Sequence, residues 1–155
     1  MKILIGGSSS KYFHLNAFSK YLKNKHVETL LVQDVNYVNG FPSRNYLQWL
    51  FPKNNIKNLI QNFKPDLIFV DRPRHFALES VKQRIPTLIH LRGDFWSEIK
   101  WAKETKYKKF PKNIVIKKWE EMGKEIFENA KCMLPICKFL ENKVQQQHPK
   151  KMTHV

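Results

Sequence analysis

Short, mostly apolar segments alternate with amphipathic helical patterns along the chain, and this alternation constrains the fold more than any other feature. The expected strands are residues 2–5, 26–33, 67–70, 87–91 and 132–136, with residues 151–155 as the start of another. The expected helices are residues 56–63, 78–85, 115–126 and 139–144, and a further helical pattern follows residue 10. Because nearly continuous apolar strands are buried on both faces, we predict an α/β fold, a Rossmann-like, doubly wound parallel sheet with helices on both faces.

The chain carries a large excess of positive charge. Lysine and arginine together number 28, against 13 aspartates and glutamates, which gives a net charge of +15. Such a balance indicates an anionic partner, for which nucleic acid, an anionic membrane surface and a phosphorylated substrate all qualify. The hydrophobic fraction of 42% is enough for a packed core and excludes global disorder.

Cysteine content and hydropathy limit the cellular setting. The two cysteines, Cys132 and Cys137, form no C-x-x-C pair, so we expect no metal site and favour a reducing compartment. No apolar stretch approaches the roughly 20 residues of a membrane span, and the first residues lack a signal-peptide core. We therefore expect a cytoplasmic protein whose contact with a membrane would be peripheral, at its inner face.

Candidate ligand-binding residues follow three of the expected strands. Parallel sheets of this kind bind ligands at the carboxyl ends of their strands. After the first strand, Gly6, Gly7 and Ser8 lead into a helical pattern, and backbone N–H groups at a helix N-terminus attract anions. The alternative is a tight strand–helix turn in which serine side chains cap the helix.

The other two strand ends carry arginines, a histidine and an aspartate. Arg72 follows the third expected strand, and Arg92 and Gly93 follow the fourth. We assign these three to substrate binding, because arginine clamps phosphate or carboxylate with two hydrogen bonds. His90 and Asp94 are the candidate catalytic residues, since either can act as a base or hold a substrate hydroxyl. The alternative is that Asp94 caps the next helix and His90 is satisfied within the fold.

Residues 100–119 combine lysines with aromatic residues. The residues of this segment expected at a membrane or substrate surface are Lys100, Trp101, Lys108, Lys109 and Phe110. Lysines beside aromatic rings suit an anionic membrane interface, and the same mixture suits single-stranded nucleic acid. The chain has no RNP1 or KH signature, which argues against nucleic acid. A third interpretation is a solvated lysine-rich surface whose aromatic residues face the core.

Four sequence segments follow one another in an informative order: KILIGGSSS, PDLIFVDRP, IPTLIHLRGDFW and NAKCMLPICKFLENKVQQQHPKKMTHV. This order resembles the amino-terminal domain of a GT-B glycosyltransferase, in particular glycosyltransferase family 4. The resemblance covers nearly the full chain and implies that residues 1–155 form one Rossmann-like half of a GT-B fold. Two positions depart from the family pattern. Cys137 stands where the family has a serine, and the counterpart of the family's His-Asp pair is either His90 or Asp94.

The resemblance implies transfer of a sugar from a nucleotide-sugar donor to an acceptor hydroxyl, with retention at the anomeric carbon. Gly6 and Gly7 would approach the donor diphosphate, while His90, Arg92 and Asp94 would line the acceptor side. The nucleotide sugar is a co-substrate, so no cofactor is implied, and the acceptor is expected to be a glycan, or a lipid-linked or anionic molecule.

In this family a carboxyl-terminal domain holds the donor nucleotide. That domain is absent from this chain, so we expect it as a partner, either as a further domain or as a separate subunit. A single half cannot assemble the site for transfer, and we expect no turnover from residues 1–155 alone.

Two other functions compete with this interpretation. A basic Rossmann- or flavodoxin-like binding module for nucleic acid or acidic partners would explain the net charge of +15. A complete small nucleotide-binding enzyme would need an acidic ribose ligand after the second strand, where Asp34 is the only candidate.

Overall fold

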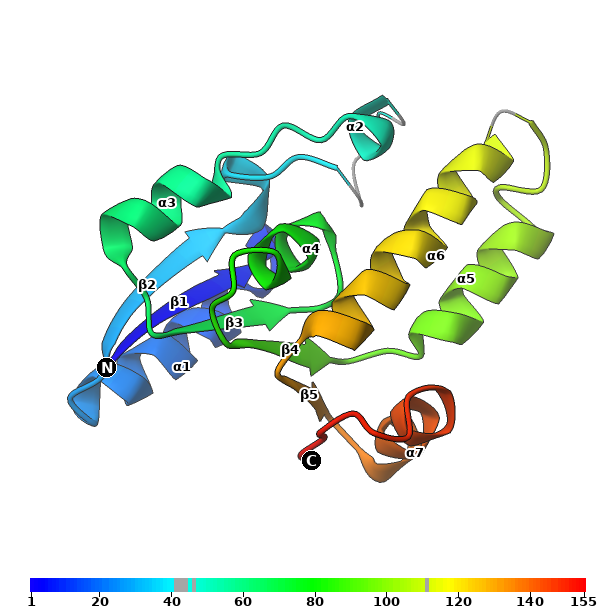
Figure 1. Ribbon diagram of the computed structural model, residues 1–155. Coiled ribbons are helices and arrows are strands. Elements are labelled where there is room, and N and C mark those ends of the chain that lie inside the picture. Colours follow the sequence, from blue (N-terminus) through cyan, green and yellow to red (C-terminus); the bar gives the residue numbers. More distant parts are fainter. Residues whose placement is uncertain (41–44, 46, 111) are drawn as a thin grey trace.

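Five parallel strands form one sheet in the order β2-β1-β3-β4-β5, which confirms the predicted α/β class and the doubly wound parallel sheet (Figure 1). The strands are β1 (Lys2–Gly7), β2 (Glu28–Gln33), β3 (Leu67–Asp71), β4 (Thr87–Leu91) and β5 (Cys132–Pro135). The computed structural model describes residues 1–40, 45, 47–110 and 112–155. After β1 the chain forms β2 on one side of β1, and it then crosses over to form β3 on the other side of β1. In such sheets ligands bind beyond the strand ends where the order reverses.

Helices cover both faces of the sheet, as predicted. They are α1 (Tyr12–Asn24), α2 (Leu47–Leu50), α3 (Ile56–Phe63), α4 (His75–Val81), α5 (Phe95–Glu104), α6 (Lys112–Asn129) and α7 (Lys138–Gln147). Two short 3-10 turns, η1 (Ser9–Lys11) and η2 (Asp34–Asn36), follow β1 and β2. The prediction of a helix over residues 78–85 was wrong at both ends. That helix begins at His75 and ends at Val81, and Arg84 then takes a left-handed backbone conformation with φ of 60°.

The two faces of the sheet carry cores of different size. Successive residues of a strand point to opposite faces. On one face, Ile5 and Phe69 pack with Leu15 of α1 in a small cluster. On the other face, strand residues such as Ile68 and Ile89 belong to a larger cluster with residues from α3 to α7. Figure 1 shows α1 on the opposite side of the sheet from α3 and α4, so the α1 face is the less covered one.

The end of the chain lies beside β5. Thr153 forms a single parallel bridge with Met133, and the His154 amide donates a hydrogen bond to the Met133 carbonyl at 3.1 Å. The expected strand at residues 151–155 is therefore present as one bridge at the edge of the sheet.

Candidate functional site

A buried carboxylate holds a histidine and an arginine at the carboxyl edge of the sheet. The Asp71 side chain is 2% exposed, and its Oδ2 accepts a hydrogen bond from Arg92 Nη2 at 2.6 Å. Its Oδ1 lies 3.2 Å from Nδ1 of His90. Asp71 and His90 are paired residues in the parallel register of β3 and β4, so the fold of the sheet itself brings the two side chains together.

The environment of Asp71 keeps it ionised. Burial by itself would raise the pKa of Asp71, but the hydrogen bond from His90 and the charge of Arg92 outweigh it and hold the pKa below its ordinary value. An ionised Asp71 favours the His90 tautomer that carries its proton on Nδ1, and this leaves Nε2 to accept a proton. A carboxylate that orients an imidazole in this way is an arrangement suited to general-base catalysis.

The Asp71–His90–Arg92 cluster lines a groove of about 470 Å³ between α1 and the sheet. The other lining residues are Lys11, His14, Leu15, Phe18, Phe69 and Leu134. Phe18 of α1 packs against Phe69 of β3, with ring centroids 5.1 Å apart. The groove thus has an apolar body and a polar end at the carboxyl edge of the sheet.

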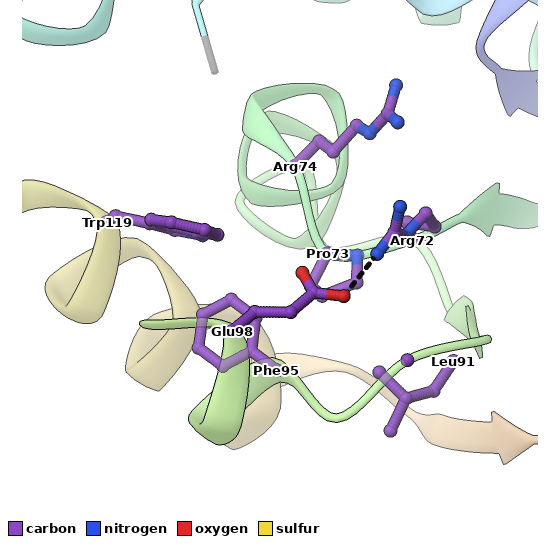
Figure 2. A pocket seen from close by; sticks show the side chains of 8 residues that line it. Arg72, Pro73, Arg74, Leu91, Phe95, Glu98 and Trp119 are labelled. Atoms are coloured by element: carbon purple, nitrogen blue, oxygen red, sulfur yellow. Dashed lines mark hydrogen bonds and ion pairs between the residues drawn. The ribbon is translucent and has the colours of Figure 1, made fainter. Parts of the chain in front are cut away.

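Two further arginines lie on the opposite face of the sheet, where Figure 2 shows a small pocket. Its volume is about 90 Å³, and Arg72, Arg74, Glu98 and Trp119 are among the lining residues. Arg72 Nη2 pairs with Glu98 Oε1 at 2.7 Å, and Arg74 points away from Glu98 in this view. Arg72 and Arg92 follow neighbouring strands, yet the pocket and the groove that they line lie on different faces.

The backbone is strained at the end of β3. Arg72 has a φ of 83°, a conformation that residues other than glycine rarely adopt. Its amide donates a hydrogen bond to the His90 carbonyl at 3.0 Å, which holds the strained residue against β4. Strain of this kind clusters at functional sites, and here it lies directly after Asp71.

The two glycines expected to admit a ligand lie within β1, and the packing of the fold requires both. A Cβ at Gly6 would collide with the ring of Phe76 from α4, and a Cβ at Gly7 would collide with Leu15 from α1. Ser8 is buried, and its hydroxyl lies 3.1 Å from the hydroxyl of Ser10. The described contacts therefore explain these three residues through helix–strand packing and a local turn.

Asp94 is occupied at the start of α5. Its carboxylate accepts hydrogen bonds from the amide of Ser97 at 3.1 Å and from the Ser97 hydroxyl at 2.7 Å. Partial burial would raise the pKa of Asp94, but the hydrogen bonds from Ser97 lower it below its ordinary value. Asp94 is thus the N-cap of α5, which agrees with the structural alternative for this residue. Asp71, which was not selected from the sequence, is the carboxylate that pairs with His90.

The lysine-rich segment divides between the surface and the core. Trp101 is 62% exposed and Phe110 is 77% exposed, whereas Tyr107 and Trp119 are buried. The lysines named above, Lys100, Lys108 and Lys109, are exposed. In Figure 1, α5 and α6 form a hairpin that extends away from the sheet, and residues 105–110 lie at its tip. The exposed aromatic residues are therefore surrounded by lysines on a projecting element.

Asp34 is buried, and its carboxylate already accepts hydrogen bonds from other groups of the protein. Its Oδ2 accepts a hydrogen bond from Arg74 Nη1 at 3.4 Å, and its Oδ1 accepts one from the amide of Val35. These contacts leave little room for a ribose hydroxyl, so they do not favour the complete nucleotide-binding enzyme.

No known protein family and no curated protein matches this chain. Within the described ranges, no three His, Cys, Asp or Glu side chains gather as they would around a metal ion. Of the helices that the structure describes, none is both long and apolar enough to cross a bilayer.

Proposed function

We propose that this chain is the acceptor-binding part of a glycosyltransferase, which moves a sugar from a nucleotide-sugar donor to an acceptor hydroxyl. The observation that supports this most is His90, which is oriented by the buried Asp71 and lines an open groove. The doubly wound sheet adds support, because ligands of such sheets bind at the carboxyl ends of the strands. The order of the four sequence segments that resemble glycosyltransferase family 4 supplies the reaction class.

His90 acts on the acceptor in this proposal. The acceptor oxygen forms a bond to the anomeric carbon, and the bond to the donor diphosphate breaks with its electron pair. Nε2 of His90 takes the hydroxyl proton, and Asp71 stabilises the imidazolium that forms. The resemblance implies retention at the anomeric carbon, which requires the acceptor oxygen to approach on the face from which the diphosphate leaves. Inversion in the product would contradict this part of the proposal.

A donor-binding domain or subunit completes the site in this proposal, because the nucleotide sugar binds mainly outside this chain. Purified residues 1–155 should therefore show no sustained sugar transfer from any nucleotide sugar. Repeated turnover by this chain alone would contradict the division into two halves.

The acceptor role can be tested by NMR titration with glycosides and with nucleotide sugars. We expect glycosides to shift the resonances of His90 and Arg92, and the His90→Gln variant to lose most of that response. His154→Gln is the matched control, because His154 is exposed beside β5 and lies outside the groove. Nucleotide sugars that shift these resonances while no glycoside does would contradict the proposal.

We extend the proposal to the α5–α6 hairpin, which would hold the protein at an anionic membrane surface. Its support is the pair of exposed rings, Trp101 and Phe110, among exposed lysines. Each lysine near such a surface contributes about 1 kcal/mol of attraction. Vesicles that contain an anionic lipid should therefore pull down the chain, and vesicles of neutral lipid should not.

Substitution of both rings tests the membrane surface separately from its charge. Trp101→Ser with Phe110→Ser should weaken vesicle binding, whereas Phe139→Ser should not, since exposed Phe139 belongs to α7. Equal losses in both variants would contradict the assignment of the hairpin.

A basic module that binds nucleic acid is the second candidate, and the net charge of +15 favours it. Oligonucleotide affinity that falls steeply with salt, with a slope that reports several phosphates, would support this function in place of the first.

A further inference from the structure

The groove beside His90 combines two features that the acceptor proposal does not use. Its body is apolar, with Phe18, Phe69 and Leu134 along it. Phe18 is 36% exposed, so part of this apolar lining meets solvent. A volume of about 470 Å³ lies within the range of small-molecule sites, about 300–1,000 Å³. The lining therefore suits a ligand with a hydrocarbon or aromatic body.

The polar end of the groove carries more positive than negative charge. Lys11 and Arg92 each contribute one positive charge, and Asp71 is the one carboxylate among the groove-lining residues. Arg92 donates to Asp71 through Nη2, but its Nε is buried and has no hydrogen-bond partner among the described residues. An anionic group at this end would balance the charge that Asp71 leaves uncompensated.

We infer that the groove between α1 and the sheet binds an anionic amphiphile. The phosphate or carboxylate head lies against Arg92 and Lys11, and the hydrocarbon body lies along Phe18, Phe69 and Leu134. The identification of this ligand with the acceptor rests on the proposed function, in which the hydroxyl of the amphiphile faces His90. The binding itself requires no sugar transfer, so the two claims fail independently.

Four small probes separate the contributions of head and body. Octyl phosphate and octanoate carry both features, octanol lacks the charge, and inorganic phosphate lacks the chain. Calorimetry with the full chain should show that octyl phosphate or octanoate binds at least about tenfold more tightly than octanol or inorganic phosphate. The stronger of the two charged probes identifies the head as phosphate or carboxylate. Similar affinity for octanol and both charged probes would overturn the inference, as would similar affinity for inorganic phosphate and octyl phosphate.

Matched variants in α1 and in η1, the turn that precedes it, test where octyl phosphate binds. Phe18→Ser should weaken octyl phosphate binding, and Phe13→Ser should not, because Phe13 is 81% exposed on α1 and lies outside the groove. Lys11→Gln should weaken it as well, and Lys20→Gln should not. Losses that do not distinguish Phe18 from Phe13 would overturn the location. The probe series in the unsubstituted chain needs no variant and so decides the ligand class even if a variant unfolds.

Turnover assays then separate this inference from the proposed function. In one outcome, octyl phosphate binds the groove while the chain with its donor-binding partner transfers no sugar to any hydroxyl. That result would contradict the acceptor role and leave the binding site supported. Sugar transfer to acceptors that do not compete with octyl phosphate would keep the function and remove the site as the acceptor groove.

Discussion

The charged residues at the carboxyl edge of the sheet have different surroundings on its two faces. Under the large core of α3 to α7, Arg72 is paired with Glu98 beside a pocket of about 90 Å³. On the α1 face, Asp71 holds His90 and Arg92 at a groove of about 470 Å³. Arg72 and Glu98 are 34% and 42% exposed, so their ion pair lies at the surface, whereas Asp71 is 2% exposed and its partners line the larger groove. The two faces therefore differ in the room that they leave for a ligand beside the charged residues.

Substitutions in the two cores should give the largest difference between the faces in the free energy of unfolding. Phe76 of α4 is buried and packs in the larger cluster. Phe76→Ala should lower the free energy of unfolding by about 3–5 kcal/mol, because it leaves a cavity that the core cannot close. Phe18→Ser on the α1 face should cost about 1 kcal/mol or less, since Phe18 is partly exposed. Urea denaturation measures both, and equal costs would contradict the difference between the faces.

Removal of the Asp71 charge should have the next largest effect. Asp71→Asn should lower the free energy of unfolding by about 3 kcal/mol, because it leaves Arg92 without its charged partner. Glu98→Gln is the matched control on the other face. Its pair with Arg72 is solvent-exposed, so the loss should stay below about 1 kcal/mol. Equal losses for Glu98→Gln and Asp71→Asn would contradict this difference between the two ion pairs.

The same aspartate should leave a signature in the pH dependence of stability. Its pKa is lowered in the folded protein, so its contribution is fully present above the unfolded pKa of about 4 and is lost as pH falls through the folded pKa. Stability of the unsubstituted chain should therefore fall more steeply with acid below about pH 4 than stability of Asp71→Asn. Parallel curves for the two proteins would show that the fold does not stabilise the ionised carboxylate.

A smaller effect is expected from the helix cap. Asp94→Ala removes the hydrogen bonds to Ser97 at the start of α5 and should cost about 1 kcal/mol of unfolding free energy. It should leave octyl phosphate binding unchanged, since Asp94 does not line the groove. An Asp94→Ala variant that folds normally but loses the ligand would restore Asp94 as a site residue.

The sequence predicts most of the strands well because they are short apolar runs between polar turns. The exception is β2 (Glu28–Gln33), which includes polar residues and begins two residues later than predicted, since His26 takes a positive φ of 60°. It predicts the site only in part, because the pairing of Asp71 with His90 depends on the register of β3 and β4, which no local pattern encodes. The clue was present in the chain, since Asp71 directly follows a wholly apolar strand. Gly6 is the reverse case: its sequence context suggests a ligand site, but its close contact with Phe76 arises only when α4 packs on the sheet.

The burial of the aromatic residues in the lysine-rich segment could be predicted only in part, because Trp119 alone shares the helical spacing of Val115, Met122 and Ile126. Tyr107 and Trp119 face the core, while Trp101 and Phe110 face solvent. All four are separated by lysines in the sequence, and the packing of α6 against α4 and α5 decides which rings are covered.

The central claim is that Asp71 orients His90 toward a ligand in the groove. The most direct test is NMR of the His90 ring nitrogens at about pH 8, above the ordinary pKa range of histidine, with and without octyl phosphate. The account predicts a proton on Nδ1 in the ligand-free protein and a shift of the Nε2 resonance when the ligand binds. A proton on Nε2 in the ligand-free protein, or binding that leaves the ring unchanged, would contradict it.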